Sequence, residues 1–266
     1  MTTPQAVSPS DLQLLLAGFP PPTLVDVRRA EAFTRDPRVI PGALRRLPET
    51  VSAWAGELDP WRRVVVYCVH GHEVGQDAAA ALRARGLDAV HLAGGIEAWQ
   101  DRGGRTVPHA APTRWVTRAR PKIDRIACPW LVRRFVDPAA EFHYVPAAQV
   151  RAFAAANGAT PYDVADVPYG HAGDRCSFDA FIRLHGLADP ALDCLAAIVR
   201  AADTGVPALS PEAPGLLAAS LGLSELFADD HAMLRAGMQM YDALYLWCRA
   251  QMRAEAESAA AAGAGA

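Results

Sequence analysis

The fold of the first half of this chain is decided by the stretch Val64-Val65-Val66-Tyr67-Cys68-Val69-His70-Gly71-His72-Glu73-Val74-Gly75. Its β-branched run predicts a buried strand, and the pattern from Gln76 to Arg85 predicts a helix. Cys68 would then lie at the carboxyl end of a strand and near the amino end of a helix, where backbone amides and the helix dipole stabilise an anion. Because such a place favours the thiolate, we predict that Cys68 is a nucleophile.

Further strands and helices alternate around this stretch. Apolar runs at 23–27 and 90–92 predict two more strands, and helices are predicted at 8–16 and 96–100. Alternation of strands and helices at this spacing is typical of a parallel α/β sheet with flanking helices.

The second half has a different pattern. Residues 108–117 are poor in apolar runs and contain two prolines, so we take them as a linker. A mainly helical α+β domain is predicted over 118–257, with strand-like residues at 115–116 and 142–145. The alanine- and glycine-rich residues 258–266 are expected to form a disordered tail.

The composition argues against a membrane protein and against a disulfide-rich secreted one. The 266 residues carry a formal net charge of −3, and no apolar run approaches the roughly 20 residues of a membrane span. The first residues show no signal-peptide pattern, and the five cysteines are scattered without a CxxC motif. We therefore expect a cytoplasmic protein with reduced thiols and no membrane partner.

Four motifs follow one another in the first half: Leu24-Val25-Asp26-Val27-Arg28, Ile40-Pro41-Gly42-Ala43, Tyr67-Cys68 with Gly71, and Leu92-Ala93-Gly94-Gly95-Ile96-Glu97-Ala98-Trp99. Together they resemble a rhodanese domain, which we place at 8–107. The resemblance implies a rhodanese-like parallel sheet with flanking helices and sulfur transfer through a persulfide on Cys68. It also implies that the amides of the loop hold the persulfide or its donor, through Val69, Gly71, Glu73 and Val74.

The loop after Cys68 departs from the rhodanese pattern. Thiosulfate-using members usually carry arginine or lysine there, because a dianion needs countercharge. Here Glu73 stands where a cation is common, and only His70 and His72 of the loop could supply positive charge. We take both histidines as catalytic candidates and expect thiosulfate to be a poorer donor than a persulfide.

A basic stretch opens the second domain. Residues 114–134 contain seven arginines and lysines and one acid. Arg125 and Arg133 are the candidates for an oxyanion-binding site. The alternatives are a solvated basic face and salt bridges to acidic helices.

Histidines and aspartates of the second domain suggest a metal site. His171 lies in a glycine-flanked loop, Asp203 ends an apolar helix, and His231 lies in the acidic start of the last helix. With Asp124 or Asp179 as a fourth ligand, this set would suit Mn, Fe or Zn better than a soft metal. Any one histidine alone could instead be a hydrogen-bonded core residue. No nucleotide cofactor is predicted.

Four segments accompany the basic stretch: Gly170-His171-Ala172-Gly173-Asp174-Arg175-Cys176-Ser177-Phe178-Asp179, Ala201-Ala202-Asp203-Thr204, Asp229-Asp230-His231 and Tyr241-Asp242-Ala243-Leu244-Tyr245. With it, they resemble the C-terminal domain of the chromate-resistance protein B family over 118–249. The resemblance implies a role in chromate resistance or in the regulation of chromate-efflux genes.

Three functions stay open. The first, which the sequence favours, is a sulfurtransferase or thiol protein joined to a metal- or oxyanion-binding domain, acting on a small sulfur donor or acceptor in chromate resistance. The second is a chromate-responsive regulator, although no helix-turn-helix pattern is visible and the net acidic charge argues against nucleic acid as a partner. The third is a catalytically silent rhodanese that docks a partner. Homo-oligomerisation stays open as well.

Overall fold

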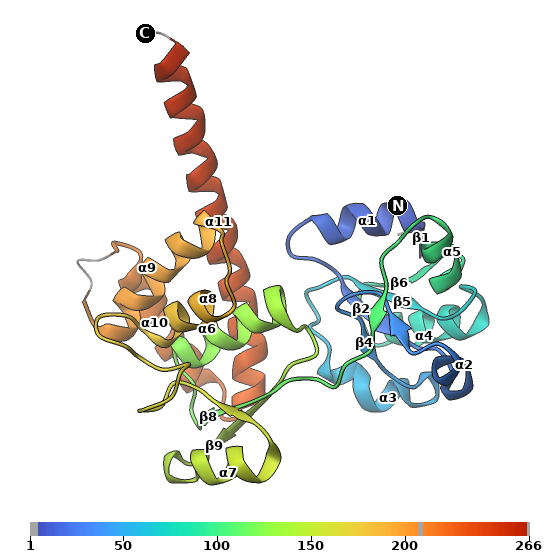
Figure 1. Ribbon diagram of the computed structural model, residues 1–266, viewed down its shortest axis with the longest axis horizontal. Coiled ribbons are helices and arrows are strands. Elements are labelled where there is room, and N and C mark those ends of the chain that lie inside the picture. The colour runs from blue at the N-terminus through green and yellow to red at the C-terminus, as the bar shows by residue number, and fades with distance from the viewer. Residues whose placement is uncertain (1–4, 207–209, 265–266) are drawn as a thin grey trace. The chain divides into compact units, whose positions relative to one another are not determined.

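The computed structural model describes residues 5–206 and 210–264. The chain divides into two compact units, which we describe separately (Figure 1). The first unit comprises residues 1–112 and 137–139, and the second comprises residues 113–136 and 140–266.

A parallel sheet of five strands forms the centre of the first unit. The strands are β1 (Ala6–Val7), β2 (Thr23–Asp26), β4 (Leu44–Arg45), β5 (Val64–Tyr67) and β6 (Ala89–Leu92). Their order is β1-β6-β5-β2-β4, and every neighbouring pair is parallel. All four residues of the central strand β5 are fully buried, as expected for a strand covered on both faces.

Helices cover both faces of this sheet: α1 (Pro9–Ala17), α2 (Ala30–Arg35), α3 (Val51–Trp54), α4 (Glu73–Arg83) and α5 (Gly95–Asp101). Two short 3-10 turns, η1 (Pro48–Thr50) and η2 (Ala55–Glu57), flank α3. Val64 and Val66 of β5 pack with Leu82 of α4, whereas Val65 and Tyr67 point to the opposite core. The predicted α/β sheet with flanking helices is confirmed. A separate antiparallel pair joins β3 (Arg38–Val39) to β7 (Val107–Pro108).

The second unit combines a small parallel sheet with a set of helices. In the sheet, β8 (Arg114–Arg118) lies between β9 (Glu141–Val145) and β10 (Thr160–Pro161). The helical segments are α6 (Asp124–Leu131), its π-helical continuation η3 (Val132–Val136), η4 (Ala147–Gln149), α7 (Val150–Asn157), α8 (Ser177–Leu184), α9 (Pro190–Thr204), α10 (Ala213–Leu226) and α11 (Asp230–Ala264). The prediction of a mainly helical α+β domain is confirmed. Across the described residues, no helix is both long and apolar enough to span a bilayer.

Two predicted boundaries differ from the structure. The expected linker at 108–117 contains most of β8, because Trp115 and Val116 are buried and pair with strands on both sides. The expected disordered tail at 258–266 begins inside α11, which continues to Ala264. Alanine has the highest helix propensity, so an alanine-rich segment readily extends a preceding helix. Residues 265–266 lie outside the described part of the chain.

A buried ion pair joins α11 to the end of α6. The two oxygens of the Asp242 carboxylate each accept a hydrogen bond from Arg134 at 2.8 Å, and Trp130 Nε1 donates to Oδ1 at 2.8 Å. Asp242 and Arg134 are less than a tenth exposed. Because a buried charge is stable only with its partner, this pair fixes how α11 packs on α6.

The amino end of α6 is also fixed by α11. Gly237 permits a close approach, since a Cβ at this position would lie 2.5 Å from Ile126 Cγ2. The Tyr241 hydroxyl donates to the carbonyl of Ile123 at 3.1 Å. Ile123 itself has a φ of +39°, a conformation that β-branched residues rarely adopt. These contacts set the position of the next residue, Asp124, the first residue of α6.

Candidate functional sites

Cys68 directly follows β5 and lines an open cavity of about 650 Å³. The wall of this cavity consists of residues 69, 70, 72–74 and 76, together with residues 28 and 29 from the turn after β2 and residue 32 of α2. Neighbouring parallel strands end at the same edge of a sheet, and β2 pairs with β5, so the two turns lie side by side. The structure thus places Cys68 at the end of a strand and just before a helix, as the sequence predicts.

The loop after Cys68 rests on the start of α5. The amide of Ile96 donates to the carbonyl of Cys68 at 3.0 Å, and the amide of Glu97 donates to the carbonyl of Val69 at 3.3 Å. Gly95 has a φ of +61°, and a Cβ there would lie 2.3 Å from the Val69 carbonyl oxygen. Glycine is therefore required beneath the loop, which gives the motif at 92–99 a physical role.

Gly75 leaves space beside the cysteine sulfur. It lies in the first turn of α4, and a Cβ at this position would lie 3.3 Å from Cys68 Sγ. The first amides of a helix lack intrahelical partners and attract negative charge. The sulfur is therefore next to the anion-stabilising end of α4, with no side chain of residue 75 between them.

The two loop histidines have different surroundings. His70 Nδ1 lies 2.8 Å from Glu97 Oε2, and both side chains are more than half exposed. His72 is the residue that precedes α4, and its ring centroid lies 5.9 Å from that of His70. Both histidines and Glu73 line the Cys68 cavity.

Arg29 adds a cation to this cavity that the sequence pattern did not reveal. It is exposed, and its side chain makes no hydrogen bond or ion pair within residues 5–206 and 210–264. The neighbouring Arg28 is buried and contacts the Asp26 carboxylate through three hydrogen-bonding contacts, which fixes the turn. The parallel pairing of β2 with β5 was the signal, because it brings residue 29 to the edge where Cys68 lies.

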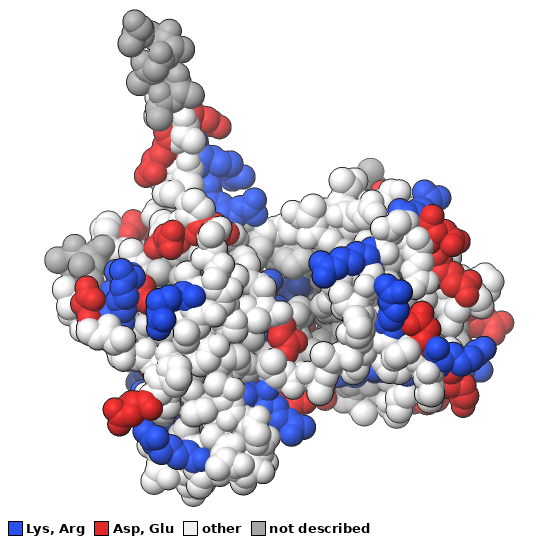
Figure 2. Space-filling model, viewed as in Figure 1, with Lys and Arg blue, Asp and Glu red and all other residues white. Residues whose placement is uncertain are grey.

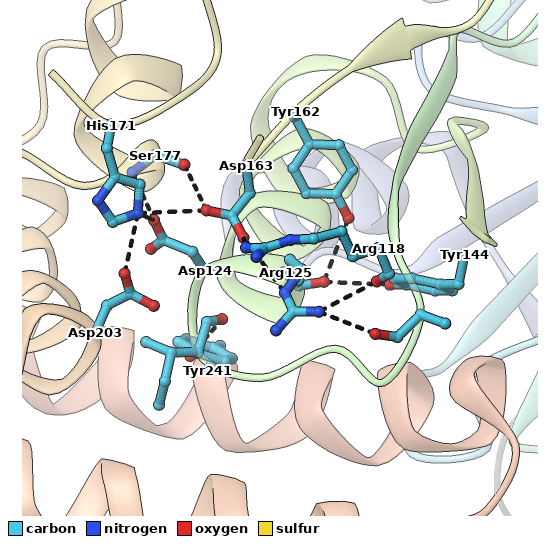
Figure 3. A network of polar contacts seen from close by, with 12 residues as sticks. Arg118, Asp124, Arg125, Tyr144, Tyr162, Asp163, His171, Ser177, Asp203 and Tyr241 are labelled. Carbon is cyan, nitrogen blue, oxygen red and sulfur yellow. Dashed lines mark hydrogen bonds and ion pairs between the residues drawn. The ribbon is translucent and has the colours of Figure 1, made fainter. Parts of the chain in front are cut away.

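A second cluster lies in the second unit, around His171 (Figure 3). Three carboxylates approach His171 Nε2: Asp203 Oδ2 at 3.1 Å, Asp163 Oδ1 at 3.3 Å and Asp124 Oδ2 at 3.5 Å. Asp124 begins α6, Asp163 follows β10, and Asp203 lies in the last turn of α9. Figure 3 shows the three carboxylates directed toward the ring.

Burial differs among these side chains. Asp124 is 0% exposed and Asp163 is 6% exposed, whereas the His171 side chain is 44% exposed. The Asp124 Oδ2 atom accepts a hydrogen bond from the amide of Ser177 at 2.5 Å, but its Oδ1 atom has no partner among the described residues. A fully buried carboxylate oxygen without a partner is costly, so this oxygen is available to a ligand.

The electrostatics of the cluster follow from this crowding. Burial raises the pKa of Asp124, and burial together with the charges of Asp124 and Asp163 raises the pKa of Asp203 to about 7. The hydrogen bond to Asp124 raises the pKa of His171 to about 9. Chemically, the cluster can hold a cation between the imidazole and the carboxylates.

The structure brings together His171, Asp203 and Asp124, but His231 does not join them. His231 lies at the start of α11 and packs against the ring of Tyr144 at 5.5 Å. Its place is taken by Asp163, which no sequence motif marked. The other alternative, Asp179, is held by Arg200 through hydrogen bonds of 2.9 and 2.6 Å.

The two arginines predicted to bind an oxyanion are both engaged with the protein. Arg125 Nε lies 3.3 Å from Asp163 Oδ2, and its Nη1 donates to the carbonyl of Ala119 at 3.0 Å. Arg133 donates twice to the carbonyl of Ala140, at 3.2 and 3.1 Å. An oxyanion at either guanidinium would therefore compete with acceptors of the chain itself.

Comparison with known families matches both units. A family model described as the C-terminal domain of ChrB matches residues 115–248, about half of the chain. The chain belongs to the ChrB C-terminal domain family. A second model, the rhodanese-like domain, matches residues 8–102. Both resemblances expected from the sequence are thereby confirmed, and the ChrB domain contains the cluster around His171.

Similar proteins are found for each domain. Protein ChrB of Cupriavidus metallidurans is 33% identical over 145 residues, which are 52% of this chain and 43% of that protein. This chain thus spans less than half of that relative. A rhodanese-like domain protein of Staphylococcus aureus is 24% identical with a TM-score of 0.36, and a rhodanese-related protein of Thermoplasma volcanium is 22% identical with a TM-score of 0.35. Both matches cover 40% of this chain and 100% of the other.

Proposed function

We propose that this protein transfers sulfane sulfur through Cys68 and that its ChrB domain binds a metal ion or an oxyanion. The two domains together would act in chromate resistance in the cytoplasm. The observation that carries the proposal is the position of Cys68 in an open cavity of about 650 Å³, beside the first turn of α4. Cys68 is only 6% exposed, but it lines this cavity, and Gly75 leaves space beside its sulfur.

The proposed reaction has two steps at Cys68. The thiolate attacks the outer sulfur of a small persulfide or of thiosulfate, the donor S–S bond breaks, and a thiolate or sulfite leaves with the bonding electron pair. The persulfide anion on Cys68 then gives its outer sulfur to a nucleophilic acceptor, which restores the thiolate. The two steps together consume no separate oxidant or reductant.

The charges of the cavity favour anionic donors. Arg29 offers a guanidinium without another partner in the described part of the chain, and such a group binds carboxylate or sulfonate oxygens well. Glu73 opposes a dianion, so we expect a persulfide to be a better donor than thiosulfate. His70 and His72 can add positive charge when they are protonated.

Cyanolysis tests the proposal. The full chain is incubated with a persulfide donor, desalted and treated with cyanide, and the thiocyanate released is measured. We expect about one sulfane sulfur per chain in the wild type, none in Cys68→Ser, and the wild-type amount in Cys194→Ser, a half-buried cysteine of the second unit. No release from the wild type, or equal release from Cys68→Ser, would contradict the proposal.

The link to chromate rests on membership in the ChrB C-terminal domain family. The contacts of the basic stretch, residues 114–134, argue against a DNA-binding regulator. Six of its seven basic side chains contact acidic side chains or backbone carbonyls of the chain: Arg114, Arg118, Arg120, Arg125, Arg133 and Arg134. On the face shown in Figure 2, basic and acidic side chains are interspersed in both units. Neither observation supports an extended surface for nucleic acid.

Growth on chromate tests this link. In a chromate-sensitive host, expression of the wild-type chain is expected to raise the tolerated chromate concentration, and Cys68→Ser is expected to remove that gain. Equal protection by Cys68→Ser would instead favour the silent docking module.

A further inference from the structure

The cluster around His171 places three carboxylates at one imidazole nitrogen. One imidazole nitrogen can donate at most one proton, yet three carboxylate oxygens lie within 3.5 Å of His171 Nε2. Arg118 and Arg125 contact Asp163 Oδ2, at 2.8 and 3.3 Å. Among the described residues, no arginine or lysine forms an ion pair with the other two aspartates.

A second observation points to a ligand. The Oδ1 atom of Asp124 is fully buried and has no hydrogen-bond partner in the described part of the chain, although the other oxygen of the same carboxylate is well satisfied. Figure 3 shows this carboxylate next to the His171 ring. An orphaned buried oxygen on a carboxylate of this cluster is what a bound cation would satisfy.

We propose that Asp124, Asp163, His171 and Asp203 bind one divalent transition-metal ion, with a preference for Mn²⁺. This inference rests on the proposed function, since it names the ligand and the residues of the ChrB domain that the proposal left open. It differs from the sequence-based set in that Asp163 replaces His231.

The spacing of the ligand atoms of Asp124, Asp163 and His171 fits a single ion, and Asp203 contacts this group through His171. Ligands about 2.0–2.2 Å from one metal, at angles between octahedral and tetrahedral, lie roughly 3.0–3.5 Å from one another. His171 Nε2 lies 3.1–3.5 Å from the three carboxylate oxygens. One ligand atom each from Asp124, Asp163 and His171 also lies within 4.8 Å of the others.

The protein already holds these ligands in place. Ser177 contacts two of the carboxylates: its amide donates to Asp124 at 2.5 Å, and its hydroxyl donates to Asp163 Oδ1 at 2.9 Å. The two arginines hold the other oxygen of Asp163. Hydrogen bonds of this kind orient ligands and are typical of built metal sites.

The donor set indicates the class of metal. Asp124, Asp163 and His171 supply two carboxylates and one imidazole, Asp203 adds a third carboxylate, and none of the four is a cysteine. Oxygen-rich sets with one imidazole suit Mn²⁺ or Fe²⁺ better than soft ions that prefer thiolate.

Metal titration of the full chain tests the site. The protein is stripped with a chelator, dialysed and titrated with MnCl₂ by calorimetry, and free Mn²⁺ is followed by its electron paramagnetic resonance signal. We expect one Mn²⁺ per chain, with at least tenfold weaker binding in Asp203→Asn and in His171→Ala. The matched control is Asp193→Asn, an exposed aspartate on the same helix, α9, which should bind as the wild type does.

The outcomes separate this inference from sulfur transfer. Cys68→Ser should bind Mn²⁺ as the wild type does, and Asp203→Asn should keep its sulfane sulfur. Circular dichroism confirms that Asp203→Asn is folded, and its one-fifth-exposed side chain makes a folding failure unexpected. No stoichiometric Mn²⁺ binding, or equal affinity in the wild type and Asp203→Asn, would overturn the inference.

Discussion

Most of the wall around Cys68 comes from one run of the chain, residues 68–76, whereas His171 and the three carboxylates around it come from four separate segments. In the first case a strand, a glycine-containing loop and a helix lie next to one another in the sequence. In the second case only the packing of α6, α9 and two loops brings the ligands together. A contiguous site can be read from its motif, but a dispersed site needs the fold.

The sharpest test of this comparison asks whether the two sites act independently. Cys68→Ser removes the only nucleophile of the first site and is expected to abolish sulfane sulfur completely, while the affinity for Mn²⁺ stays within twofold of the wild type. His171→Ala is expected to give the reverse result. Cyanolysis and calorimetry on the same preparations measure both quantities, and a joint loss in either variant would break the comparison.

The dispersed site depends on the packing of the second unit. A buried contact of that unit should therefore contribute more to its free energy of unfolding than a contact at the surface. Asp242→Ala removes the carboxylate that Arg134 and Trp130 contact, and we expect a loss of about 3–5 kcal/mol in the free energy of unfolding of the second unit. Glu141→Gln, which breaks the exposed pair with Arg114, should cost less than about 1 kcal/mol. Urea unfolding followed by circular dichroism compares them, and equal losses would contradict the role of Asp242.

At the contiguous site, a single methyl group added at residue 75 should lower the rate of sulfur transfer. Gly75→Ala places a Cβ 3.3 Å from Cys68 Sγ, and we expect the rate of sulfur transfer to fall by about tenfold. The matched control is Gly56→Ala, where an added Cβ would meet nothing within 4 Å. Thiocyanate formation with excess cyanide gives both rates. A rate for Gly75→Ala equal to that of the control would show that the space beside the sulfur is not used.

The smallest predicted effect concerns Arg29, the cation in the turn after β2. Arg29→Gln should raise KM for thiosulfate roughly threefold to tenfold with little change in kcat, because an exposed charge contact contributes about 1 kcal/mol. Arg35→Gln, an exposed arginine of α2, is the control. A change in kcat alone would place Arg29 outside donor binding.

The same comparison explains what the sequence could predict. The run Val64–Tyr67 is apolar throughout, which identifies a central parallel strand and, with it, the position of Cys68. Arg29 was missed because its approach depends on the pairing of β2 with β5. Asp163 was missed because it lies in a loop without a periodic pattern, and its left-handed backbone, with φ of +49°, appears only in the structure. His231 lies outside the cluster, against Tyr144, because the sequence does not show which side of α11 faces α6 and α9.

The central claim, that Cys68 carries a transferable sulfur, is tested most directly by peptide mass spectrometry. The folded chain is treated with a persulfide donor, alkylated and digested, and the masses of the peptides that contain the five cysteines are measured. We predict that the Cys68 peptide gains the mass of one sulfur atom, because Cys68 lines the cavity although it is only 6% exposed. Cys128, Cys176 and Cys248 are 0% exposed and should stay unmodified. A Cys68 peptide without added sulfur, or an equal gain on the buried cysteines, would contradict the account.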